Sequence, residues 1–123
     1  MTYPINERGG WIVPAGSVIS ADTRVPAYSE FGEHCWLDQR CDLGECCDLG
    51  LGCVLRPGCH LGPGCTLGER AVLGRGCTLE ADCELGRDCM LGDGCELGPC
   101  CKIGAGCMFG ADCVIPRDCT FEL

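Results

Sequence analysis

The stretch that decides the fold is Cys83-Glu84-Leu85-Gly86-Arg87-Asp88, followed directly by Cys89-Met90-Leu91-Gly92-Asp93-Gly94. Both halves read Cys-x-Leu-Gly-x-x, and this six-residue unit continues without insertion from Trp11 onward. Because a fixed short period is the signature of a repeat architecture, the whole chain is best read in units of six. The large apolar position is aliphatic or Phe in every unit: Val13, Ile19, Val25, Phe31, Leu37, Leu43, Leu49, Leu55, Leu61, Leu67, Leu73, Leu79, Leu85, Leu91, Leu97, Ile103, Phe109, Ile115 and Phe121.

Two residues before the large position lies a smaller one in every unit except the first, where it is Trp11. The smaller residue is cysteine in every unit from Cys35 onward except at Ala71. A small-x-large triplet predicts a three-residue strand whose outer members point to the same side. Glycine follows the large residue in eleven of the nineteen units, where the chain must bend. A strand this short cannot bury its inner face alone, so neighbouring units must stack. The sequence therefore predicts an all-β solenoid over residues 11–123, preceded by an arm or cap over residues 1–10.

This unit resembles the hexapeptide repeat of left-handed parallel β-helix proteins, in which three units form one triangular coil. The resemblance covers residues 11–123. It implies a single-stranded, triangular solenoid of about six coils with 18 residues each, and it alone supplies the left hand, because crossovers in parallel sheets are normally right-handed. With strands about 4.8 Å apart, such a prism is roughly 30 Å long.

Composition narrows the possible partners and compartments. Eighteen acidic and nine basic residues give a net charge of −9, which disfavours binding to nucleic acid. No basic segment followed by an apolar run opens the chain, and no stretch approaches the roughly 18 apolar residues of a membrane span, so no membrane partner is predicted. We expect a cytoplasmic protein with reduced thiols, since most cysteines mark one structural position of the repeat.

Fourteen of the sixteen cysteines occupy inward positions, where a thiol behaves as a small, inert hydrophobe. Their Cys-x5-Cys spacing does not match that of zinc sites, and we predict neither a metal nor a cofactor. Cys46 and Cys100 stand outside this pattern. They are separated by three whole coils, so we expect two exposed thiols on one corner, roughly 14 Å apart.

The resemblance also suggests an enzyme as an alternative. Acyltransferases of this superfamily use a catalytic His and interrupt the helix with a loop, and γ-class carbonic anhydrases gather three His around a metal at a trimer interface. This chain has no interruption after Trp11 and only two histidines, His34 and His60, which the 18-residue period places on different faces. Both are weak catalytic candidates, for a site between subunits. The sequence leaves any small-molecule ligand open.

The middle residue of each triplet points outward, and one of the three faces is apolar throughout. Its column consists of Val18, Trp36, Val54, Val72, Met90 and Met108, and Leu51 adjoins it at a corner. Contiguous apolar surface of this kind usually marks a contact. The sequence therefore predicts a non-catalytic structural or interaction module that self-associates through this face. The resemblance favours a homotrimer, and a dimer is the alternative.

Overall fold

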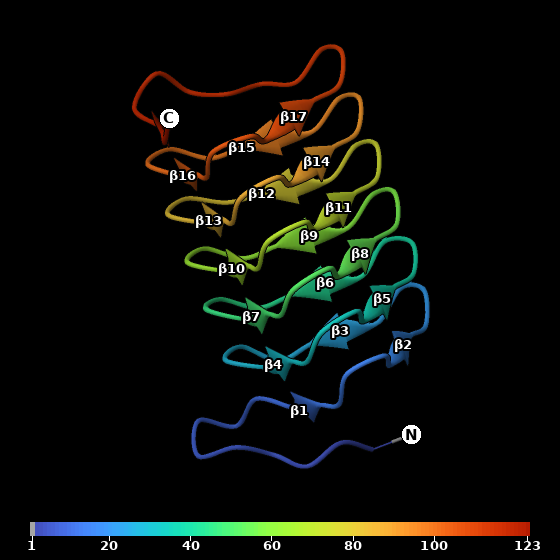
Figure 1. Cartoon of the computed structure of the whole chain (residues 1–123). Helices are drawn as coiled ribbons and strands as arrows, with labels where there is room; N and C mark the ends of the chain where they lie inside the picture. The colour runs from blue at the N-terminus through green and yellow to red at the C-terminus, as the bar shows by residue number, and fades with distance from the viewer. Residues whose placement is uncertain (1) are drawn as a thin grey trace.

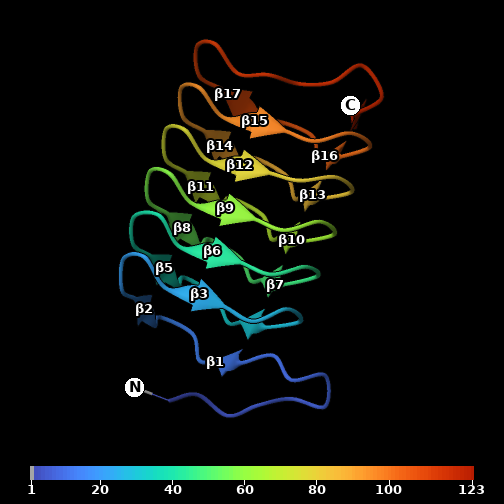
Figure 2. The same cartoon turned by 180° about the vertical axis from the view of Figure 1, so that it is seen from behind.

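The computed structural model describes residues 2–123 as a stack of 18-residue coils, with the two ends of the chain at opposite ends of the stack (Figures 1 and 2). Every regular element among these residues is a strand. The all-β solenoid of about six coils, each made of three hexapeptides, is thereby confirmed. Of the predicted arm, Met1 lies outside the described residues.

Eighteen strands form three parallel sheets, one along each face of the solenoid. The seven-stranded sheet contains β1 (Ile12–Val13), β4 (Glu30–Phe31), β7 (Asp48–Leu49), β10 (Thr66–Leu67), β13 (Glu84–Leu85), β16 (Lys102–Ile103) and β18 (Thr120–Phe121). The six-stranded sheet contains β2 (Val18–Ile19), β5 (Trp36–Leu37), β8 (Val54–Leu55), β11 (Val72–Leu73), β14 (Met90–Leu91) and β17 (Met108–Phe109). The five-stranded sheet contains β3 (Arg24–Val25), β6 (Asp42–Leu43), β9 (His60–Leu61), β12 (Thr78–Leu79) and β15 (Glu96–Leu97).

The strands are two residues long, one shorter than the triplet predicted from the repeat. The small inward residue lies at the end of the preceding turn, yet its carbonyl still takes part in the ladder. The Thr78 amide, for example, donates to the Cys59 carbonyl at 3.0 Å. Each residue therefore pairs with the one 18 positions away, and side chains of one kind stack into columns.

The interior contains the small and large positions of the repeat, as alternation requires. The large residues are buried from Val13 to Ile103, and every cysteine of the inward set from Cys35 to Cys101 is buried as well. Burial decreases in the last coil, where Phe109 and Ile115 are only partly covered. Phe121 is 55% exposed because no further coil lies above it.

Glycines serve two different purposes at the corners. Gly76 has a φ of 69°, the left-handed conformation that favours glycine, and a Cβ added there would meet nothing within 4 Å. Gly68 instead follows a strand directly, and an added Cβ would lie 2.7 Å from the Gly50 carbonyl carbon. The first kind permits the turn, and the second lets one coil approach the next closely.

The two ends of the solenoid differ in how the backbone groups at their strand edges are paired. At the first coil, the Ile12 amide donates to the Pro4 carbonyl at 2.8 Å, and the Tyr3 and Trp11 rings lie 5.4 Å apart. At the last coil, the five-stranded sheet continues only as an isolated bridge between Glu96 and Val114. Pro116 lies where the next ladder donor belongs and has no N–H, which explains why this strand is not completed.

Candidate functional site

The outward side of the six-stranded sheet is an uninterrupted apolar column, which we call the apolar face: Val18, Trp36, Val54, Val72, Met90 and Met108. Val18 is 67% exposed, Met108 63% and Met90 51%. Val54 and the neighbouring corner residue Leu51 are half-buried. Parallel pairing in register aligns the six side chains over six successive coils, so the surface is both continuous and rigid.

Trp36 is the largest member of the apolar face and is 44% exposed. The Arg56 guanidinium lies over its ring, 5.2 Å from the centroid, which is the geometry of a cation–π contact. A shallow hollow beside the ring is lined by Val18, Trp36, Asp38 and Arg56. The contact holds Trp36 in place on the face while leaving nearly half of its surface open.

The edges of the apolar face are rich in glycine. They are formed by the residues two positions before and two positions after each member of the column. Half of these twelve residues are glycine, and the charged ones are confined to the middle coils. One edge reads Gly16, His34, Gly52, Arg70, Asp88 and Gly106, and the other reads Ser20, Asp38, Arg56, Gly74, Gly92 and Gly110. The first and last coils therefore carry no charged side chain at these positions.

The other two faces are mostly polar. The seven-stranded sheet presents Glu30, Asp48, Thr66, Glu84 and Lys102 in one column. Burial and the nearby Glu30 carboxylate raise the pKa of Asp48 above its ordinary value. The three faces therefore share the same backbone architecture and differ in the polarity of their outward side chains.

The two histidines lie on different parts of the solenoid. On the five-stranded sheet, His60 Nδ1 lies 3.3 Å from Asp42 and Nε2 lies 3.2 Å from Glu80, so carboxylates engage both ring nitrogens. His34 lies at a corner with a φ of 57°, and its Nε2 is 3.9 Å from Glu33. Within residues 2–123, no three His, Cys, Asp or Glu side chains converge as metal ligands.

Each of the fourteen inward thiols donates a hydrogen bond to the carbonyl 21 residues earlier, on the coil below. Cys59 reaches the Asp38 carbonyl at 3.2 Å, and Cys83 reaches Gly62 at 3.4 Å. The hydroxyls at the same position of the first coils instead bond within their own coil, as Ser17 does to Pro14 at 2.7 Å. This link between coils was not visible from the sequence, because it depends on which carbonyl the side chain reaches.

Burial raises the pKa of the Cys53 and Cys89 thiols to about 11 and that of Cys101 to about 12. Thiols with raised pKa values are poor nucleophiles and poor metal ligands. The thiols of Cys53, Cys89 and Cys101 are therefore suited to packing and to weak hydrogen bonding between coils.

Cys46 and Cys100 are exposed and lie at the same corner, three coils apart. Both adopt left-handed backbone conformations, with φ values of 55° and 63°. The Cys100 Sγ lies 3.5 Å from Asp118, and this carboxylate raises the pKa of the Cys100 thiol. These are the two thiols of the chain that reagents in water can reach most readily.

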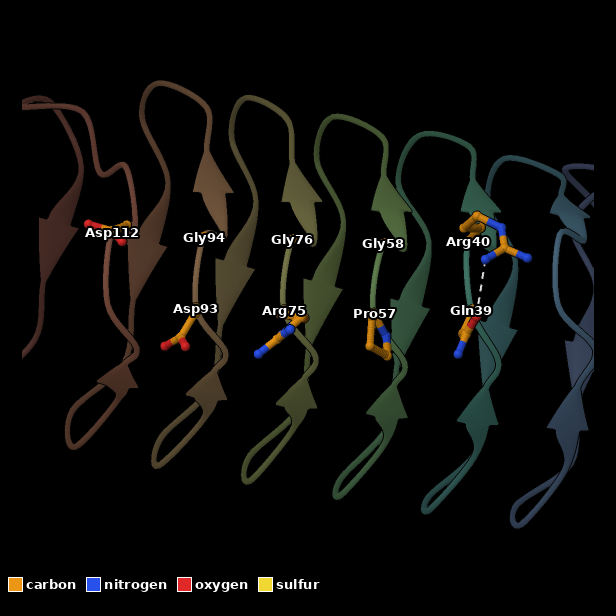
Figure 3. Close-up of a pocket in the computed structure, with 9 residues that line it drawn as sticks. All are labelled: Gln39, Arg40, Pro57, Gly58, Arg75, Gly76, Asp93, Gly94 and Asp112. Carbon is orange, nitrogen blue, oxygen red and sulfur yellow. Dashed lines mark hydrogen bonds between the residues drawn. The ribbon is translucent and has the colours of Figure 1, made fainter.

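A second surface feature runs along the corner between the six-stranded and five-stranded sheets (Figure 3). Successive turns line a shallow hollow of about 560 Å³, with Arg40, Arg75, Asp93 and Asp112 among its residues. Figure 3 shows two rows of residues, one from each side of the turn, with a hydrogen bond between Arg40 and Gln39 at 3.1 Å. Arg40 also pairs with Asp22 at 2.8 Å. The charged groups are spread over several coils and do not converge on one point.

Comparison with known protein families gives a match that lies within the repeat. A family model described as bacterial transferase hexapeptide (six repeats) matches residues 82–117, which is two coils of the solenoid. This chain carries the hexapeptide repeat of the left-handed β-helix superfamily. The same period and the same inward pattern continue from Trp11 through the coils before this segment. Neither a curated protein nor a solved structure matches this chain significantly. Residues 2–123 contain no helix long and apolar enough to cross a membrane.

Proposed function

We propose that this chain is a non-catalytic structural and interaction module, a rigid β-helical prism that self-associates through its apolar face. The observation that carries the proposal is the column from Val18 to Met108, six apolar outward positions without interruption. The hydrophobic effect favours removing such a surface from water. Tryptophan and methionine are also enriched where proteins meet. The superfamily resemblance favours three copies, and two copies are the alternative.

The arrangement of the polar groups supports the same proposal. Asp42 and Glu80 engage both nitrogens of His60, and the inward thiols are buried donors to backbone carbonyls. An interface enzyme that uses His34 or His60 is the second candidate, motivated by the transferase repeat over residues 82–117. It requires a neighbouring subunit to supply the groups that would complete a site.

Sedimentation velocity over a range of concentrations tests the proposal. The Val72→Glu variant places a carboxylate in the middle of the apolar face, and burying an unpaired charge is costly. We expect wild type to associate and Val72→Glu to remain monomeric. Thr66→Glu, on the polar seven-stranded sheet, is the matched control and should associate like wild type. A wild-type protein that stays monomeric at high concentration would contradict the proposal.

Native mass spectrometry of protein purified without chelator distinguishes the two candidate functions. A clean multiple of the chain mass supports the structural module. Additional mass equal to a metal or cofactor, at about one per subunit, would favour the enzyme. His34→Ala and His60→Ala are then the first variants to assay.

A further inference from the structure

We propose that the apolar face is covered by the same face of a second copy, with the two prisms antiparallel and related by a two-fold axis. The inference rests on the proposed self-association and adds the partner, the stoichiometry and the orientation. In this arrangement Val18 faces Met108 of the second copy, and Trp36 faces Met90 of the second copy. Val54 faces Val72 of the second copy near the axis.

The first argument concerns the number of copies. The column lies on one flat side of a three-sided solenoid. Two such faces laid against each other remove the whole column from water. Three such faces turned toward a common axis touch only along their edges and leave a channel between the columns. Because the stabilisation follows the apolar area removed from water, a pair covers this surface better than a ring of three.

The second argument concerns orientation. Two rigid sheets pack at one distance, so the side chains that meet should have similar combined size along the interface. A parallel pair would stack Trp36 on Trp36 and, two rungs further on, Val72 on Val72, which makes the gap uneven. The antiparallel pair reduces this difference, because Trp36 meets the smaller Met90 and Met108 meets the smaller Val18, so that no rung joins two tryptophans. Trp36 then meets a flexible thioether, which packs well against an aromatic ring.

The third argument is the fit of the edges. Arg56 extends from its own coil toward the coil of Trp36, as its contact with that ring requires. In the antiparallel pair this coil lies opposite the coil of Met90 of the second copy, whose neighbouring corner carries an exposed Asp93. The two-fold axis generates this opposite-charge pairing twice. The backbone of Arg56 itself lies opposite Gly74 of the second copy, so the first carbons of the arginine side chain meet a position without a side chain.

The contribution of Trp36 gives a quantitative test of the contact. Tryptophan is enriched among interface hot spots, and truncation of such a residue weakens association by about thirtyfold or more. We expect Trp36→Ala to raise the dissociation constant by at least that factor. Glu84→Ala, an exposed change on the seven-stranded sheet, should leave the dissociation constant unchanged.

Cross-linking tests the orientation. The background variant replaces the exposed thiols (Cys46→Ser and Cys100→Ser), and Val18→Cys or Met108→Cys is then added to it separately. A short bifunctional maleimide should join a Val18→Cys chain to a Met108→Cys chain in a mixture of the two proteins. It should join neither protein to itself, because equivalent positions lie five rungs apart along the axis, roughly 24 Å. The background protein without an added thiol is the control.

The possible outcomes separate the two proposals. A covalent dimer only in the mixture supports the antiparallel pair. A covalent dimer in the Val18→Cys sample alone would indicate parallel prisms and overturn the orientation. Association in sedimentation without any cross-link, or a sedimenting trimer, would also overturn it while leaving self-association in place. A wild-type monomer at all concentrations would contradict both proposals.

Discussion

Two glycines that look alike in the repeat should respond very differently to alanine. Gly68 follows β10 directly, and an added Cβ there would lie 2.7 to 2.8 Å from backbone atoms of Gly50 and Leu51. Its amide also donates to the Leu49 carbonyl at 2.8 Å. Gly76 lies in the following turn with a φ of 69°, and a Cβ added there would meet nothing within 4 Å.

The magnitudes follow from these contacts. Gly68→Ala drives a methyl group into backbone that the ladder holds from both sides, so overpacking and a weakened inter-coil hydrogen bond add to about 3–4 kcal/mol of destabilisation. Gly76→Ala costs about 1–2 kcal/mol for the left-handed conformation. Alanine also restricts the unfolded chain, which offsets about 0.4–1 kcal/mol in each variant and cancels in the comparison. The expected difference between the two variants is about 1–3 kcal/mol.

Equilibrium unfolding in urea, followed by circular dichroism at one fixed protein concentration, measures both values. The slopes of the transitions should be compared as well, because solenoids can lose their ends before their middle. Hydrogen exchange at the Gly68 amide provides a local readout of the same contact. If Gly68→Ala unfolds within about 0.5 kcal/mol of Gly76→Ala, the close approach of the coils is not what requires glycine there.

Two further predictions concern the last coil and the exposed thiols. Pro116→Ala should restore an N–H beside the Leu97 carbonyl, in the way that the Gly98 amide donates to the Leu79 carbonyl at 2.7 Å one coil earlier. Hydrogen exchange should then show new protection of the amide at position 116. An unprotected amide there would count against the explanation. In a Cys46→Ser background, Asp118→Asn should accelerate maleimide labelling of Cys100 near pH 8 several-fold. The reason is that the carboxylate that raises the pKa of the Cys100 thiol is removed, so more thiolate forms. A mass-spectrometric time course with an unchanged labelling rate would refute this role of Asp118.

The repeat predicted most of the architecture because parallel stacking preserves the phase of the sequence. Once the coil length is 18 residues, Val18, Trp36 and Val54 must fall in one column, and Cys46 and Cys100 must share a corner. Burial followed in the same way, since alternation within each unit sends the small and large residues inward. The role of the apolar column stays a prediction until association is measured.

The parts that the sequence did not predict depend on contacts between coils. The direction in which a corner side chain leans decides whether it meets the coil below or the coil above. Because of this direction, Glu80 contacts His60 and Arg56 contacts Trp36, and each pair is 20 positions apart. The repeat period alone aligns residues that are 18 positions apart. The shortened strands and the bridge left at Val114 likewise follow from turn geometry and from one missing amide at Pro116.

The sequence by itself determined the period, the inward and outward residues and the apolar column, because these need only alternation and a constant coil length. Only the tertiary structure decided which carbonyl each thiol reaches, which glycines permit a turn and which permit close approach, and how the acids surround His60. The reason is physical: side-chain hydrogen bonds and packing depend on distances of a few ångströms between coils, and a linear period does not specify them.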